Sequence, residues 1–251
     1  MNLPRVLVPN KGLSIGHRVV PDKRTIHHLQ NVLRLTHGSR VVLVDGEGSA
    51  FMARIVHQEG TPELEVVSEA PDDRAVKQLV RLVLVVSLLK SDLTELAIQK
   101  TTEAGVAEVL VAVCDRSIPR PDRDGLATRE NRFRRVAEAA ARQCGRGTIP
   151  RVSAHLSLDG ALKHLAPDLP RFVLFEGPGS RLLADHLKGG DDPGAVLATG
   201  PEGSFTAREI ALFEEAGFKK AGLGPRVLRA ETAAIASVVV AQTMMGDMGT
   251  N

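Results

Sequence analysis

The pattern of apolar and polar positions differs between the beginning of the chain and the rest of it. Near the start the apolar segments are short: 41–45 and 49–56 are separated by a turn with two glycines, and 64–68 could pair beside them. Strands joined in this way predict a hairpin. Between 25 and 34 the apolar residues have the spacing of a helix. The pattern predicts a small β-barrel with one helix over residues 1–70.

From residue 77 onward the pattern is that of an α/β domain. Residues 79–89 are a near-continuous run of Val and Leu, which is typical of a strand buried on both faces of a parallel sheet. A helix follows, for which Asp92 and Glu95 predict a capping box and Gly105 predicts the end. The remaining predicted strands are 109–113, 172–175, 196–198 and 221–223, and the remaining predicted helices are 128–143, one that Thr206 and Glu209 begin, and 231–245.

Residues 71–76 are polar and contain proline, so we expect a linker there between a domain at 1–70 and a domain at 77–251. The first residues lack the apolar core of a signal peptide, and the run 79–89 is too short to span a bilayer. Two cysteines cannot form a disulfide framework. These features predict a cytoplasmic protein that is not a membrane protein.

Composition adds an uneven distribution of charge. The 251 residues have a net charge of only +2 and 3% aromatic residues, with no Trp and no Tyr, which argues against a protein that stacks nucleic-acid bases on aromatic platforms. However, residues 1–40 and 116–151 each carry about +6, which leaves about −10 for the remainder. Exposed arginines could simply form pairs along a helix, but this surplus is too large for pairing alone and favours an anionic partner.

Three loops that follow predicted strands are rich in glycine and proline. They span 174–179, 197–203 and 223–233, and ligands of open α/β sheets bind at the carboxyl ends of strands. Each loop alone could be an ordinary turn, but three in one half of the chain favour a shared pocket. None matches G-x-G-x-x-G or Walker A, so a nucleotide phosphate cradle is disfavoured.

The last of these loops also carries charge. Arg226 and Arg229 are costly to place between a strand and a helix unless they face solvent or an anion, whereas Glu231 and Thr232 could simply cap the helix. The sequence lacks G-x-S-x-G and H-E-x-x-H motifs, and its histidines match no standard zinc spacing. We therefore expect no metal.

Six segments, taken together and in order, resemble one family. They are 28–34 (HLQNVLR), 45–48 (DGEG), 90–106 with Lys90, Glu95, Lys100 and Glu103, 143–146 (QCGR), 200–203 (GPEG) and 223–233 (LGPRVLRAETA). Along essentially its whole length the chain resembles the RsmE family, the bacterial 16S ribosomal RNA uridine N3-methyltransferases of the SPOUT superfamily. The last segment is long and the most specific.

The resemblance implies a PUA-like β-barrel that helps to bind RNA, and a SPOUT α/β domain with a deep trefoil knot at about 172–245. It implies S-adenosylmethionine as cofactor, a homodimer, and 16S ribosomal RNA of the 30S subunit as partner. The activity that it implies is methylation of N3 of one uridine, at position 1498 of that RNA. A non-catalytic protein of ribosome assembly, and a SPOUT methylase acting on another RNA position or atom, remain alternatives.

The resemblance also implies roles for individual residues. Arg229 is expected to stabilise or orient the uracil or a phosphate, with Glu231 and Thr232 as positioning groups or proton acceptors. The residues expected at the cofactor are Leu174, Phe175, Glu176, Gly177, Thr199, Gly200, Pro201, Glu202, Gly203, Leu223, Gly224, Arg226, Val227 and Leu228. The arginines of the basic segments that we expect to contact RNA are Arg5, Arg18, Arg34, Arg116, Arg132, Arg135, Arg142 and Arg146.

Two positions depart from the family pattern. Ser204 replaces the usual Gly after GPEG, a tolerable change because Ser is a good helix N-cap. Arg142 replaces the usual Glu before QCGR, which removes any acidic role at that position and adds to the basic surface.

Overall fold

The computed structural model describes residues 3–8, 12–58, 61–70, 80–177, 180–189, 192–246 and 248. The chain divides into two compact units, of which the first comprises Met1–Lys77 with Ala141–Ile149 and the second Gln78–Ala140 with Pro150–Asn251. The expected linker at 71–76 lies outside the described residues. The inclusion of 141–149 in the first unit was not predicted.

The first unit is built on one five-stranded sheet. Its strands, in spatial order, are β1 (Arg5–Leu7), β3 (Arg40–Val44), β4 (Ala50–Gln58), β5 (Thr61–Glu69) and β2 (Arg18–Val19). The predicted hairpin is present as the antiparallel pair β3–β4, and β1 pairs with β3 in parallel. The predicted helix is present in part, as α1 (Lys23–His27) followed by a π-helical turn, η1 (His28–Val32). Alternating inward residues such as Val41, Leu43 and Ile55 form the core of this unit.

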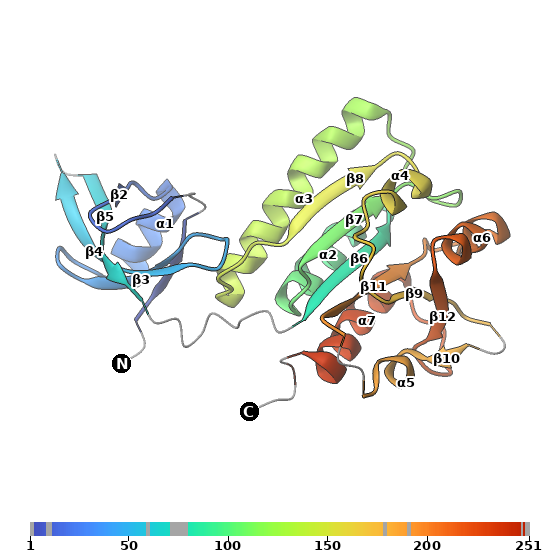
Figure 1. Cartoon of the computed structure of the whole chain (residues 1–251). Helices are drawn as coiled ribbons and strands as arrows, with labels where there is room; N and C mark the ends of the chain where they lie inside the picture. Colours follow the sequence, from blue (N-terminus) through green and yellow to red (C-terminus); the bar gives the residue numbers. More distant parts are fainter. Residues whose placement is uncertain are drawn as a thin grey trace. The chain divides into compact units, whose positions relative to one another are not determined.

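The second unit is a seven-stranded parallel sheet with helices on both faces (Figure 1). Its strands, in spatial order, are β10 (Arg181–Leu182), β12 (Phe218–Gly222), β9 (Arg171–Leu174), β11 (Gly194–Thr199), β6 (Arg81–Ser87), β7 (Glu108–Ala112) and β8 (Arg151–His155). The helices are α2 (Leu93–Glu103), α3 (Arg123–Cys144), α4 (Leu158–Leu162), α5 (Leu183–Leu187), α6 (Ala207–Glu215) and α7 (Ala230–Met245). The last turn of α3, from residue 141, belongs to the first unit. Every predicted element of this region is present, with shifted ends, whereas β8, β10, α4 and α5 were not predicted.

Strand β6 lies in the middle of the sheet and is buried on both faces, as its unbroken apolar run predicts. Leu82, Leu84 and Val86 face the core that α2, α3, α5 and α7 cover, whereas Val83 and Val85 face the core under α4 and α6. Both layers of helices are therefore held by the same strand. None of the helices in the described part of the chain is long and apolar enough to cross a membrane.

The predicted capping box of α2 is wrong, whereas that of α6 is confirmed. Asp92 makes no side-chain hydrogen bond to the start of α2, and Glu95 pairs with Arg132 at 2.8 Å instead. The reason is the backbone: Ser91 has a positive φ of 50°, so Asp92 enters the helix at φ −96° and ψ 7° rather than in the extended conformation that capping requires. Thr206 is extended and forms the full box with Glu209.

Replacing Leu84 by Ala removes a fully buried side chain from the centre of β6. We expect the free energy of unfolding to fall by about 2–5 kcal/mol, because the buried contacts are lost and a cavity remains. Urea denaturation followed by far-UV circular dichroism measures this change. The matched control is Leu96→Ala on α2, where the residue is 38% exposed and we expect a much smaller effect. Equal losses in the two variants would contradict the assignment of β6 to the core.

Candidate functional site

A cavity of about 490 Å³ opens at one edge of the parallel sheet. The segments that line it follow the carboxyl ends of β6, β9, β11 and β12 and include the first turns of α2 and α7. The lining residues are Lys90, Leu93, Leu174, Glu176, Thr199, Gly200, Pro201, Glu202, Ser204, Val227, Leu228, Arg229, Ala230, Glu231 and Ala233. All of them belong to the second unit.

The sheet order explains why these distant segments meet. Strands β12, β9, β11 and β6 are consecutive neighbours and all parallel, so their carboxyl ends lie along the same edge. Open α/β sheets bind their ligands at this edge. The cavity is therefore in the place where the three glycine-rich loops predicted a shared pocket.

The cavity includes most of the predicted cofactor and catalytic residues. Those that line it are Leu174, Glu176, Thr199, Gly200, Pro201, Glu202, Val227, Leu228, Arg229 and Glu231. Those that do not line it are Phe175, Gly177, Gly203, Leu223, Gly224, Arg226 and Thr232, each of which is within four residues of one that does. The roles of both groups stay predictions.

Sequence reasoning missed five lining residues, namely Lys90, Leu93, Ser204, Ala230 and Ala233. The loop after β6 has no glycine or proline between Ser87 and Leu93 to mark it. The signal that could have found it is its position after a buried parallel strand, because the carboxyl-end rule applies to β6 as it does to β11.

The loop after β11 is held on three sides. The Ser87 hydroxyl donates to the carbonyl of Thr199 at 3.1 Å, and the amide of Lys90 donates to Oε1 of Glu202 at 3.1 Å. The guanidinium of Arg116 donates to the carbonyl of Gly203 at 2.8 Å. Two of these bonds come from the end of β6, the neighbour of β11, and the third comes from the segment after β7, the next strand along the sheet.

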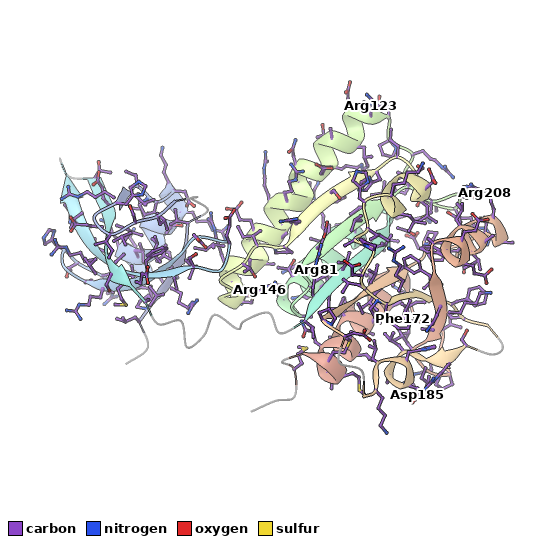
Figure 2. All side chains as sticks on the ribbon, in the orientation of Figure 1. Arg81, Arg123, Arg146, Phe172, Asp185 and Arg208 are labelled. Atoms are coloured by element: carbon purple, nitrogen blue, oxygen red, sulfur yellow. The ribbon has the colours of Figure 1, made fainter. Side chains whose placement is uncertain are left out.

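A cluster of charged groups secures the far end of the same loop. Glu209 is fully buried, and its Oε1 accepts the amide of Asp115 at 2.8 Å while its Oε2 accepts the amide of Thr206 at 2.8 Å. Asp115 in turn accepts two bonds from Arg208, at 2.6 and 3.2 Å. The hydrogen bond from Arg208, in the first turn of α6 (Figure 2), is the largest cause that lowers the pKa of Asp115 below its ordinary value of 3.8.

The loop after β12 is tied to the loop after β9. The amide of Leu228 donates to Oε1 of Glu176 at 3.2 Å. Arg229 is the N-cap residue of α7 and, in the part of the chain described, its side chain makes no capping bond. Glu176 thus fixes the backbone beside Arg229 at the cavity.

Two buried polar atoms of the cavity wall have no hydrogen-bond partner among the described residues. They are Oγ1 of Thr199, which is 1% exposed, and Oε2 of Glu231, which is 7% exposed. A buried polar atom without a partner costs free energy, on the order of 1–3 kcal/mol. The wall is therefore suited to a ligand that supplies hydrogen-bond donors. Outside the masked positions, no group of His, Cys, Asp and Glu side chains could hold a metal ion.

Several of the arginines expected to contact RNA have partners within their own unit. In the first unit Arg18 pairs with Glu65 at 3.3 Å, Arg142 pairs with Asp22 at 2.7 Å, and Arg146 donates to the Thr148 hydroxyl at 3.3 Å. Arg5 is partly buried there. In the second unit Arg116 holds Gly203 and Arg132 pairs with Glu95. The exposed members of the set are Arg18, Arg34, Arg116, Arg132 and Arg135. Their contact with RNA stays a prediction.

Two family models match most of the chain. Residues 76–242 match the family described as RNA methyltransferase domain, and residues 20–67 match the family described as RNA methyltransferase PUA domain. The chain is 33% identical over 212 residues to the ribosomal RNA small subunit methyltransferase E of Synechocystis sp.. That alignment covers 83% of this chain and 67% of the Synechocystis protein. It is 32% identical to the protein of the same name from Mycobacterium tuberculosis, over 87% of this chain and 84% of that one.

Two solved structures are similar to nearly the whole chain. A ribosomal RNA small subunit methyltransferase E from Neisseria gonorrhoeae, bound to S-adenosyl methionine, aligns with a TM-score of 0.81 and 30% identity over 96% of this chain and 98% of that one. A methyltransferase from Legionella pneumophila in complex with the same cofactor aligns with a TM-score of 0.82 and 27% identity over 99% and 100%.

Replacing Arg208 by Met keeps the aliphatic stem but removes the guanidinium from Asp115. We expect the pKa of Asp115 to rise toward 3.8, measured by a carbon-detected NMR titration of its carboxyl group. Because the folded-state pKa is lowered, this carboxylate adds stability above about pH 4 that is lost as the pH falls through the folded value. The variant lacks most of that contribution. The control is Arg123→Met on α3 (Figure 2), and an Asp115 pKa that is the same in both variants contradicts the network.

Proposed function

The chain belongs to the family of ribosomal RNA small subunit methyltransferase E, and we propose that it transfers a methyl group from S-adenosylmethionine to N3 of one uridine in 16S ribosomal RNA. The observation that carries the proposal is the cavity at the carboxyl ends of β6, β9, β11 and β12, because it combines carboxylates, cations and unpaired buried polar atoms in one place. A protein that only binds RNA has no need of such a cavity.

The residues of the cavity fit the cofactor. S-adenosylmethionine has a net positive charge and several hydrogen-bond donors, and the wall carries the carboxylates of Glu176 and Glu202 together with the unpaired hydroxyl of Thr199. These groups would hold the cofactor, and the apolar Leu174, with the other loop residues, would cover its flat surfaces. When bound, the cofactor supplies an electrophilic methyl group on a sulfonium.

The uracil that accepts the methyl group needs a different contribution from the protein. The N3–H group of uracil is a weak acid, so its proton must leave and the negative charge that remains must be stabilised. The unpaired Oε2 of Glu231 is suited to accept that proton. The guanidinium of Arg229, at the same cavity, is suited to stabilise or orient the uracil. The remaining acceleration comes from holding donor and acceptor in the reactive orientation.

For RNA recognition we propose that the first unit, as a PUA-like β-barrel, and the arginines of the basic segments hold the phosphates of 16S RNA in the 30S subunit. Arginine suits phosphate because its guanidinium forms bidentate hydrogen bonds. Since the chain has no Trp or Tyr, charge contacts should dominate over base stacking, and affinity should fall steeply with salt.

We further propose that the protein is a cytoplasmic homodimer whose second unit contains a trefoil knot at about 172–245. Helix α7 supports the dimer, because it is rich in Ala, Val and Met and leaves Ile235, Val239, Val240 and Met245 only partly buried. Such a helix gains stability from an additional apolar partner. Sedimentation at micromolar concentration tests this part: a mass of twice 26.9 kDa supports the dimer, and a mass of 26.9 kDa contradicts it.

Two measurements on the wild-type protein test the function itself. Calorimetry should detect binding of S-adenosylmethionine, and incubation of the protein with the cofactor and 30S subunits should yield 3-methyluridine, identified by mass spectrometry of 16S RNA. The absence of cofactor binding favours the alternative of a ribosome-assembly protein without catalysis. A methyl group on a ribose oxygen or on another RNA favours a different methylase.

Replacing Arg229 by Gln tests the role of its guanidinium. Arg229 is exposed and caps nothing with its side chain, so the fold should persist. We expect the rate of methylation to fall by roughly 100-fold or more, as for loss of one charge-stabilising donor, with binding of the cofactor retained. The control is Arg181→Gln on β10, an exposed arginine outside the cavity wall and outside the two basic segments. A normal rate in the Arg229 variant contradicts the assignment.

A further inference from the structure

Two helices begin at the cavity, and neither has a side-chain cap. In the described structure the N-cap residues are Asp92 for α2, with 11 residues, and Arg229 for α7, with 16, and neither side chain bonds to the first turn. Helix N-termini carry unpaired amides and partial positive charge, which favour an anion. Helix α6, by contrast, begins outside the cavity wall and has a complete capping box.

A cationic side chain lies at the start of each of these helices. Lys90 lies just before α2 and Arg229 just before α7, and both line the cavity. Within the described ranges neither side chain makes a hydrogen bond or ion pair, although Lys100, Lys163 and Lys220 all pair with carboxylates. Two unpaired cations at two uncapped helix ends are an arrangement suited to a negatively charged group.

The carboxylates of the cavity wall anchor the backbone beside these cations. Glu202 accepts the amide of Lys90 itself, and Glu176 accepts the amide of Leu228, next to Arg229. Glu231 is the third carboxylate that lines the cavity. The two anchoring bonds use backbone donors, so they hold the starting points of both helices and leave the ammonium and the guanidinium for a ligand.

An independent observation points to a ligand at the same place. Oε2 of Glu231, a residue that is only 7% exposed, is buried in the wall without a hydrogen-bond partner in the described part of the chain. Glu231 lies in the first turn of α7, so an unpaired acceptor and an unpaired cation are adjacent there. A group that donates a proton and retains a negative charge would satisfy both.

We propose that Lys90, with Arg229 and the N-termini of α2 and α7, forms an anion subsite for the uracil ring after it has lost its N3 proton. This inference rests on the proposed function. In the step that it serves, the N3–H bond breaks, the proton passes to Oε2 of Glu231, and the electron pair stays on the ring. The charge spreads from N3 to the two carbonyl oxygens beside it, which gives two positions for positive groups. Lys90 is therefore assigned as a second catalytic cation.

The experiment compares Lys90→Gln with Lys100→Gln, which lies on the same helix but outside the cavity wall and pairs with Glu103. Single-turnover methylation of 30S subunits at saturating cofactor gives the rate of the chemical step at each pH. Calorimetry gives the affinity for S-adenosylmethionine, filter binding at several salt concentrations gives the affinity for RNA, and thermal unfolding verifies the fold.

We expect the rate of the Lys90→Gln variant to fall roughly 10- to 100-fold at neutral pH, with both affinities and the melting temperature unchanged. The deficit should shrink as the pH rises, because deprotonation of the uridine then needs less help from the protein. Lys90→Arg should recover most of the rate, and Lys100→Gln should behave as wild type.

Three results would overturn the inference. An unchanged single-turnover rate shows that Lys90 does not act on the acceptor. Weaker cofactor binding alone shows that Lys90 holds the carboxylate of the cofactor. If the plot of log RNA affinity against log salt concentration becomes less steep by about one unit, the loss of about one phosphate contact, Lys90 holds the RNA backbone. If the wild-type protein itself binds no cofactor or forms no 3-methyluridine, the proposed function fails, which is a separate outcome.

Discussion

The parallel pairing of β12, β9, β11 and β6 is the constraint on which the candidate site depends. Strand β11 lies between β9 and β6, with Val196 opposite Arg171 on one side and Val83 on the other. As a result, residues as far apart in sequence as Lys90 and Arg229 line one cavity. A shift of one residue in this pairing would exchange the side chains that face the two layers of helices, so the apolar core and the site are fixed by the same register.

The loops at this edge are joined to one another by carboxylates. Glu202 connects the loop after β11 to that after β6, Glu176 connects the loop after β9 to that after β12, and buried Glu209 connects α6 to the end of β7. Two of the three non-glycine residues with positive φ in the described chain, Ser91 and Ser204, lie in these loops. Local backbone strain of this kind persists only where surrounding bonds hold it, and it is concentrated at functional sites. Groups that are held in place before the ligand arrives need little reorganisation during the reaction.

Local patterns predict most of this architecture but not its long-range partners. The unbroken apolar run at 79–89 predicts β6, and the spacing of Thr206 and Glu209 predicts the capping box of α6, because both depend on neighbours in sequence. The capping box of α2 fails because Ser91 and Asp92 do not have the extended backbone that capping requires and because Arg132, from another helix, pairs with Glu95. No local pattern contains either feature. Lys90 was missed as a lining residue for a similar reason. It lies at the cavity because β6 is next to β11 in the sheet, and the sequence around Lys90 does not contain that order. Arg116 was expected to contact RNA from its charge alone, whereas its bond to Gly203 comes from the proximity of two loops.

Hydrogen–deuterium exchange with and without S-adenosylmethionine tests most directly that the sheet edge is the methyl-transfer site. The account predicts that the cofactor slows exchange in the segments 88–94, 174–177, 199–204 and 226–233, which line the cavity from four strands. It predicts no change in β3 and β4 of the first unit. Protection confined to other segments, or no protection at a cofactor concentration that saturates binding, would contradict it.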